Sequence, residues 1–147
     1  MDEQQCRQIA IGVFEDIQKE FPHLKCLLET EPKIPVDVYM DIPKQSHLDF
    51  DIAVYLSGDE LHLSVDPFWV EWFPCTNPKT VSEYLKAVRG LLSGRFRIVE
   101  YYKDGRPVRA VLEEPVGDTW ATVTSWGRLH FSFGKKTTVV KQNKSAP

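Results

Sequence analysis

Apolar residues recur at steps of three and four in two segments of this chain, and each segment is predicted to form an amphipathic helix. The first apolar stripe consists of Cys6, Ile9, Ala10, Val13, Phe14, Ile17 and Phe21. The second consists of Val81, Tyr84, Leu85, Val88, Leu91 and Leu92. Residues typical of helix ends flank both stripes. Asp2 and Pro22 enclose the first, and the pair Asn77-Pro78 and Gly94 enclose the second.

Other segments alternate between apolar and polar residues, which is the pattern of strands with one buried face. The alternating segments are 36–40, 47–56, 61–65, 96–102, 108–112, 119–125 and 129–133, and a short apolar run at 24–28 precedes them. A turn at 57–60 pairs Leu56 with Leu61, and Asp104-Gly105 is a strong hairpin signal. The strands are therefore expected to be mostly antiparallel.

The two halves of the chain resemble each other. Residues 61–65 read LHLSV and residues 129–133 read LHFSF, and each half has the order of a helix followed by strands. We interpret this as a tandem αββββ duplication, with halves 2–74 and 75–141 and a flexible basic tail at 142–147. The predicted fold is a single α+β domain, residues 1–147, with two helices packed on one face of a mostly antiparallel, curved sheet.

Composition and charge narrow the function. The 147 residues are 42% hydrophobic and 27% charged, with a net charge of −3, which is typical of a globular protein and argues against a nucleic-acid partner. The lysines between Lys135 and Lys144 are interpreted as a solvated terminus. The first residues do not resemble a signal peptide, and no apolar run is long enough to span a membrane, so a cytoplasmic protein is expected.

Cysteine usage predicts neither a disulfide framework nor a thiolate zinc site. The chain has three cysteines, Cys6, Cys26 and Cys75, and no two of them are close in sequence. Walker, dinucleotide-binding, zincin and kinase motifs are all missing from the sequence, so no cofactor is predicted.

An acidic cluster is the first of three candidate sites on the polar sheet face. The turn at 57–60 places Asp51 opposite Asp66, with Asp49 and His47 nearby. Opposed like charges are unfavourable unless they are solvated or balanced by a cation. Oxygen ligands of this kind suit a hard divalent metal. We favour a solvated strand edge, and no metal site is predicted.

A histidine pair is the second candidate. His62 and His130 each lie two residues before a serine on the same strand face. Catalysis by serine needs a base within hydrogen-bond reach, whereas side chains two apart on a strand are about 6–7 Å apart. The chain also lacks a Gly-x-Ser-x-Gly elbow. We therefore interpret both histidines as structural.

An aromatic cluster at 68–73 is the third candidate, and it marks the clearest difference between the halves, because its counterpart reads KTTVVK. The cluster is either a segment buried on both sides or a contact surface, since Trp and Phe are favoured at interfaces. The predicted function is a non-enzymatic, acidic binding protein, of the inhibitor or immunity type, that recognises a protein partner or associates with itself. Its predicted partner-binding residues are Phe68, Trp69, Trp72, Phe73, Asp51 and Asp66.

The sequence also allows a second function. The same polar face could bind a small molecule or a metal, with or without catalysis. The residues predicted for this alternative are Asp51, Tyr55, His62, Trp120 and His130.

Overall fold

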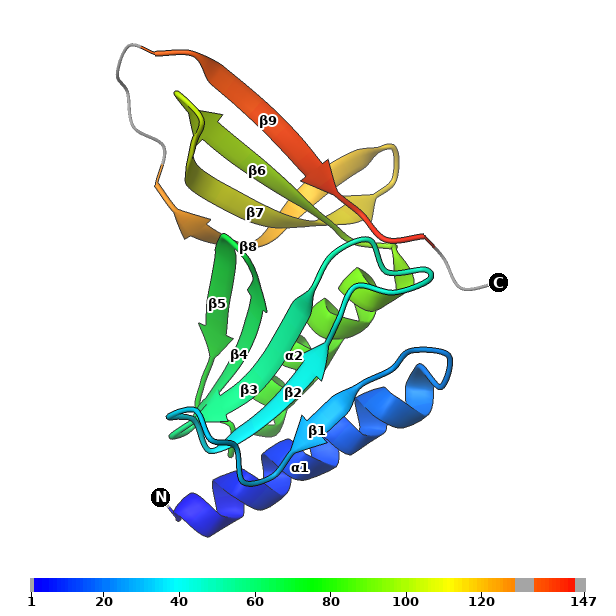
Figure 1. Ribbon diagram of the computed structural model, residues 1–147, viewed down its shortest axis with the longest axis vertical. Coiled ribbons are helices and arrows are strands. Elements are labelled where there is room, and N and C mark those ends of the chain that lie inside the picture. Colours follow the sequence, from blue (N-terminus) through cyan, green and yellow to red (C-terminus); the bar gives the residue numbers. More distant parts are fainter. Residues whose placement is uncertain (1, 129–133, 145–147) are drawn as a thin grey trace.

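Two helices and two antiparallel sheets make up the fold in the computed structural model, which describes residues 2–128 and 134–144 (Figure 1). The helices are α1 (Glu3–Glu20) and α2 (Pro78–Ser93). The first sheet has the order β1 (Leu27–Glu29), β2 (Val38–Ile42), β3 (Ile52–Ser57), β4 (Glu60–Val65) and β5 (Phe68–Trp72). The second sheet has the order β8 (Thr119–Gly127), β7 (Arg106–Val116), β6 (Arg97–Lys103) and β9 (Lys136–Lys141). The predicted α+β class is confirmed, with the strands divided between two sheets.

Both helices begin and end where the sequence predicts. The Asp2 carboxylate accepts a 2.9 Å hydrogen bond from the Gln4 amide at the start of α1. Asn77 caps α2 in the same way, and Gly94 ends it with a φ of 80°, a left-handed conformation that favours glycine. Neither helix of the described residues is long and apolar enough to cross a membrane.

One face of the first sheet forms the core. Helix α1 packs against β2 and β3, α2 packs against β5, and the two helices touch each other behind the sheet (Figure 1). Alternate residues of the strands point towards the helices and are buried: Val38, Met40, Ile42, Ile52, Val54, Leu56, Leu61, Leu63, Val65, Phe68 and Val70. Ile98, Ala110 and Leu112 of the second sheet join the same cluster. The opposite face of the first sheet is left for polar and aromatic side chains.

The register that the 57–60 turn predicts is observed, since Leu56 pairs with Leu61. The strand predicted over 47–56 begins later, at Ile52. Gln45 and Leu48 exchange backbone hydrogen bonds, and His47 between them has a φ of 70°. This tight turn replaces the first part of the strand, yet Leu48 stays fully buried.

The second sheet contains the Asp104-Gly105 hairpin between β6 and β7, as predicted. Strand β9 lies within the lysine-rich stretch that we interpreted as a solvated terminus, and it pairs with β6. The tail predicted to be flexible over 142–147 is packed against the protein at Asn143. Asn143 is buried, accepts a hydrogen bond from the Asp49 amide and donates one to the Leu91 carbonyl. Asn143 thereby fastens the end of β9 to the end of α2.

The internal duplication is not confirmed. The first half forms five strands in sequence order, whereas β9 of the second half returns to lie beside β6. Both helices cover the first sheet, so α2 does not cover its own half as α1 does. The LHFSF segment and His130 lie outside the described residues. The duplication therefore stays a prediction.

Candidate functional site

A row of stacked rings crosses the open face of the first sheet. Tyr39, Tyr55 and His62 are direct cross-strand neighbours on β2, β3 and β4. The Tyr39 and Tyr55 ring centroids are 6.1 Å apart, and the Tyr55 and His62 centroids are 4.6 Å apart with an interplanar angle of 5°. Trp69 on β5 continues the row, with its centroid 5.7 Å from that of His62. Cross-strand aromatic pairs of this kind stabilise a sheet.

His62 lies inside this row and is only 4% exposed, although it is on the outer sheet face. Its Nδ1 accepts a 2.9 Å hydrogen bond from the Trp69 indole N–H. Because Nδ1 is the acceptor, the proton of the neutral ring is on Nε2, which is 3.1 Å from the Glu60 carboxylate and donates to it. Both ring nitrogens are therefore occupied, and Glu60 and Trp69 fix the orientation of the ring.

Trp69 combines exposure with a fixed orientation. Its side chain is 48% exposed, and its polar atom is committed to His62. One edge of the indole is thus held by the protein while about half of the side chain stays exposed. A large aromatic surface that loses little freedom on binding is characteristic of interface hot spots.

The aromatic cluster at 68–73 divides between the core and the surface. Phe68 is fully buried and contributes no surface to a partner. Trp72 is half-buried against the core, with its ring centroid 5.4 Å from that of Tyr84 on α2. Phe73, in contrast, is 58% exposed. Some residues of this segment are therefore buried and others are available as a contact surface, because successive side chains of β5 alternate between the two sheet faces.

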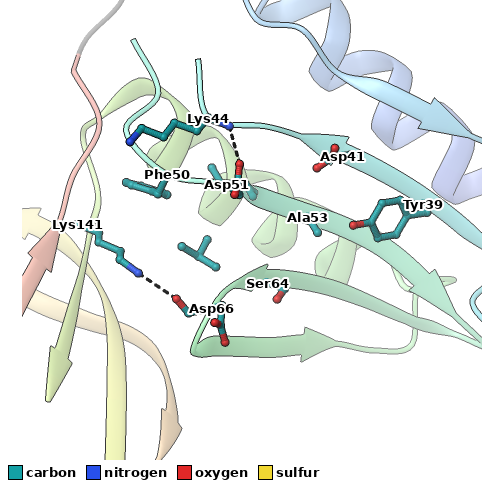
Figure 2. Close-up of a pocket in the computed structure, with 11 residues that line it drawn as sticks. Tyr39, Asp41, Lys44, Phe50, Asp51, Ala53, Ser64, Asp66 and Lys141 are labelled. Carbon is teal, nitrogen blue, oxygen red and sulfur yellow. Dashed lines mark hydrogen bonds between the residues drawn. The ribbon is translucent and has the colours of Figure 1, made fainter. Parts of the chain in front are cut away.

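A pocket of about 420 Å³ lies on the open face where the first sheet meets the end of β9 (Figure 2). Asp41, Asp51 and Asp66 come to it from β2 and from the ends of β3 and β4. Its other described lining residues are Tyr39, Lys44, Phe50, Ile52, Ala53, Ser64, Val65 and Lys141. The predicted proximity of Asp51 and Asp66 is observed to the extent that both line this pocket.

The pocket has a negative character that its lysines only partly offset. Partial burial raises the pKa of the Asp41 carboxyl, and the charges of Asp51 and Glu29 raise it further. Asp51 accepts a 2.8 Å hydrogen bond from the Lys44 backbone amide, so this contact brings no cationic charge to the carboxylate. The ammonium of Lys141 donates to the Asp66 backbone carbonyl at the edge of the pocket (Figure 2). The same ammonium pairs with the Glu100 carboxylate, which offsets part of its charge.

The described residues do not assemble a metal centre. Within 2–128 and 134–144, no three His, Cys, Asp or Glu side chains are grouped closely enough to hold an ion.

A second cleft, of about 370 Å³, lies between the two sheets where β5 faces β8. Trp69 and Glu71 line it from β5, and Trp126 lines it from β8. Val70, Thr124, Ser125 and Gly127 complete its described lining. Trp69 is opposite Ser64 across the sheet, and Ser64 lines the acidic pocket, so the two hollows are neighbours on one face.

The residues predicted for a small-molecule site are not gathered in one place. Asp51 lines the acidic pocket, whereas Tyr55 and His62 belong to the stacked row. Trp120 is on β8 of the second sheet, where the Arg97 guanidinium carbon lies 4.1 Å from its ring centroid. His130 lies outside the described residues.

Comparisons with protein-family models, with curated proteins and with solved structures find no match to this chain.

Sequence reasoning missed three contributors to this surface: Glu60, Glu71 and Lys141. Glu71 was available from the pattern, because a short turn at 66–67 places Glu71 opposite His62 and on the same face as Trp69. The position of Lys141 could not be inferred from the pattern, since it depends on β9 pairing with β6 across 32 or more intervening residues.

Proposed function

We propose that this chain is a non-enzymatic protein that binds a basic protein partner through the open face of its first sheet. The observation that carries the proposal is Trp69, which is 48% exposed while its indole nitrogen is locked to the buried His62. Exposed tryptophan at a fixed orientation is well suited to anchor a partner, because little freedom remains to be lost on association. Phe73 extends the exposed aromatic surface beyond the end of β5.

The charge of the face supports a basic partner. Asp41, Asp51 and Asp66 line the pocket beside Trp69, and the chain carries a net charge of −3. Complementary charge steers association and disfavours wrong partners. It also disfavours self-association through this face, because a two-fold contact would bring the acidic pockets of both copies together.

The state of His62 favours binding over catalysis. A general base needs a free ring nitrogen that can reach a substrate proton, and both nitrogens of His62 are engaged by Glu60 and Trp69. An acidic inhibitor or immunity-type protein that acts in the cytoplasm fits these features. We take this as the working function.

Affinity capture from the source organism tests the proposal. Wild-type protein, Trp69→Ala and the charge variant D51N/D66N serve as baits, with Val116→Ala as the control for loss of an exposed apolar side chain remote from the face. We expect a basic protein to be retained by wild type and Val116→Ala and to be lost from the other two, and to be released by salt. Purified partner must then bind wild type in titration calorimetry. Equal capture of every protein by wild type and Trp69→Ala, with all variants folded, would refute the proposal.

A further inference from the structure

Arg97, Trp120 and Glu113 show how this chain itself accommodates a guanidinium group. The Arg97 guanidinium carbon lies 4.1 Å from the centroid of the Trp120 ring, and its Nε donates a 2.8 Å hydrogen bond to Glu113. The three side chains come from β6, β8 and β7, and Arg97 is half-buried between the other two. Stacking on an indole and pairing with a carboxylate thus hold the same cation.

The cleft between β5 and β8 has the same components and no cation of its own among its described lining residues. Trp69 and Trp126 provide two indoles, and Glu71 provides a carboxylate on the same sheet face as Trp69. Its volume of about 370 Å³ exceeds what one side chain needs, so a partner's backbone can approach as well.

From this correspondence we propose that the cleft between β5 and β8 receives an arginine side chain of the basic partner, an assignment that rests on the proposed function. The guanidinium stacks on the indoles of Trp69 and Trp126 and pairs with the Glu71 carboxylate. Arginine suits the cleft better than lysine, because its planar cation is weakly hydrated, stacks on aromatic faces and pairs with a carboxylate through two N–H groups.

The hydrogen bond from Trp69 to His62 prepares the cleft for this ligand. Because the indole N–H is already bound, the Trp69 ring keeps its orientation before the partner arrives. The acidic pocket next to the cleft adds a field that attracts cations, since Asp66 and Asp51 are both exposed. Stacking surface, counter-charge and orientation are therefore all present in the free protein.

The test uses blocked tripeptides, because the partner is not needed to examine the cleft. Acetyl-Gly-Arg-Gly-amide, its lysine counterpart and its citrulline counterpart are titrated separately into the full chain, and the indole N–H signals of all four tryptophans are followed by NMR. Citrulline keeps the shape of arginine without its charge. We expect the arginine peptide to shift the Trp69 and Trp126 signals with millimolar affinity, and the citrulline peptide to shift neither.

Variants locate the binding. Glu71→Gln, at an exposed position, and Trp126→Phe are each expected to weaken the arginine peptide about two- to fivefold, in line with exposed charge pairs and cation–π contacts. Val116→Ala is expected to leave the affinity unchanged. Equal binding of the citrulline or lysine peptide, unchanged affinity in Glu71→Gln, or no shift of either indole would overturn the arginine assignment.

The two proposals fail separately. Loss of partner capture in Trp69→Ala, together with no response to the arginine peptide, removes the arginine assignment and leaves the proposed function standing. Unchanged capture in Trp69→Ala removes the proposed function even when the cleft binds arginine.

Discussion

The Tyr84 hydroxyl donates a 2.7 Å hydrogen bond to the backbone carbonyl of His62. Tyr84 is a fully buried residue of α2, and His62 is at the centre of the stacked row on the far side of the sheet. Helix α2 therefore fixes the backbone of the residue whose ring holds Trp69. His62 thereby links the core to the proposed binding face.

Removal of that hydroxyl is predicted to destabilise the fold. Tyr84→Phe removes this donor from the buried His62 carbonyl, and we expect a loss of about 0.5–1.5 kcal/mol in the free energy of unfolding. Urea unfolding measures the loss. Tyr101→Phe, at a half-buried position on β6, is the control and is expected to change stability by less than about 0.5 kcal/mol. Equal stability of Tyr84→Phe and wild type would show that the bond contributes nothing.

Local signals in the sequence were enough to predict the helices, the class and much of the first sheet. Asn77, Pro78 and Gly94 define α2 through capping preferences that act over a few residues. The alternation of β4 and the length of the 57–60 turn set a register that is observed. Periodicity is thus informative where neighbours in sequence are neighbours in space.

The pairing of β9 and the orientation of Trp69 could not be predicted in this way, because they depend on contacts between residues that are distant in sequence. The β-branched run TTVV in β9 is compatible with a strand, but its flanking lysines indicated a solvated terminus, and only pairing with β6 decides between them. The fixed orientation of Trp69 likewise depends on His62 adopting one tautomer, which follows from Glu60. The alternation of apolar and polar residues predicted that His62 faces outward, but it gives no information on the hydrogen bonds that this side chain makes on the sheet surface.

Substitution by alanine at two helix glycines is predicted to change the stability of the protein in opposite directions. A Cβ at Gly90 in α2 would overlap the ring of Phe96, which is buried, so Gly90→Ala is expected to cost about 1–3 kcal/mol through overpacking. A Cβ at Gly12 in α1 meets nothing within 4 Å. Gly12→Ala is expected to stabilise by about 0.4–1 kcal/mol, because alanine lowers the entropy of the unfolded chain. Thermal unfolding of both variants checks the sign. A stabilising Gly90→Ala would contradict the packing of α2 against Phe96.

Asn143 is predicted to matter more than its position near the end of the chain suggests. Asn143→Ala removes the acceptor for the Asp49 amide and the donor to the Leu91 carbonyl, with an expected loss of about 1–3 kcal/mol. Gln142→Ala is the matched control, because Gln142 is exposed and makes a hydrogen bond to the Gly94 carbonyl. Chemical denaturation should separate the two variants by at least about 1 kcal/mol. A loss of stability in Gln142→Ala but not in Asn143→Ala would show that Gln142, and not Asn143, anchors this end of the chain.

Stability is predicted to fall in alkaline solution. Burial and the neighbouring Cys6 raise the pKa of the Cys75 thiol from its ordinary value of 9.0 to about 12. The folded state thus keeps the thiol proton that the unfolded state loses above pH 9, so this contribution is complete below pH 9 and is lost as the pH rises towards 12. Burial also raises the pKa of the Tyr84 hydroxyl well above its ordinary value, which acts in the same direction. Unfolding free energies from pH 8 to pH 11 should fall less steeply in Cys75→Ala than in wild type, and parallel curves would rule out the thiol as a cause.

Loss of the Lys141 ammonium is predicted to cost more stability than loss of the cation in any other ion pair of the described residues, because its partner Glu100 is buried. The Glu100 side chain is 1% exposed, and its Oε2 is 2.7 Å from the Lys141 ammonium but makes no well-aligned hydrogen bond. The Tyr102 hydroxyl donates to the other oxygen. Lys141→Met leaves a buried carboxylate without its cation, with an expected loss of about 3–5 kcal/mol.

Replacement of both charges is expected to recover most of that loss. In the double variant E100M/K141M no charge remains to be desolvated, and apolar pairs in place of buried ion pairs are often neutral or stabilising. Lys136→Met, at an exposed position of the same strand, is the control and should change stability by less than about 0.5 kcal/mol. Urea unfolding of wild type, Glu100→Met, Lys141→Met and the double variant completes the double-mutant cycle. A Lys141→Met variant no less stable than Lys136→Met would show that the pair of Glu100 and Lys141 contributes nothing to stability.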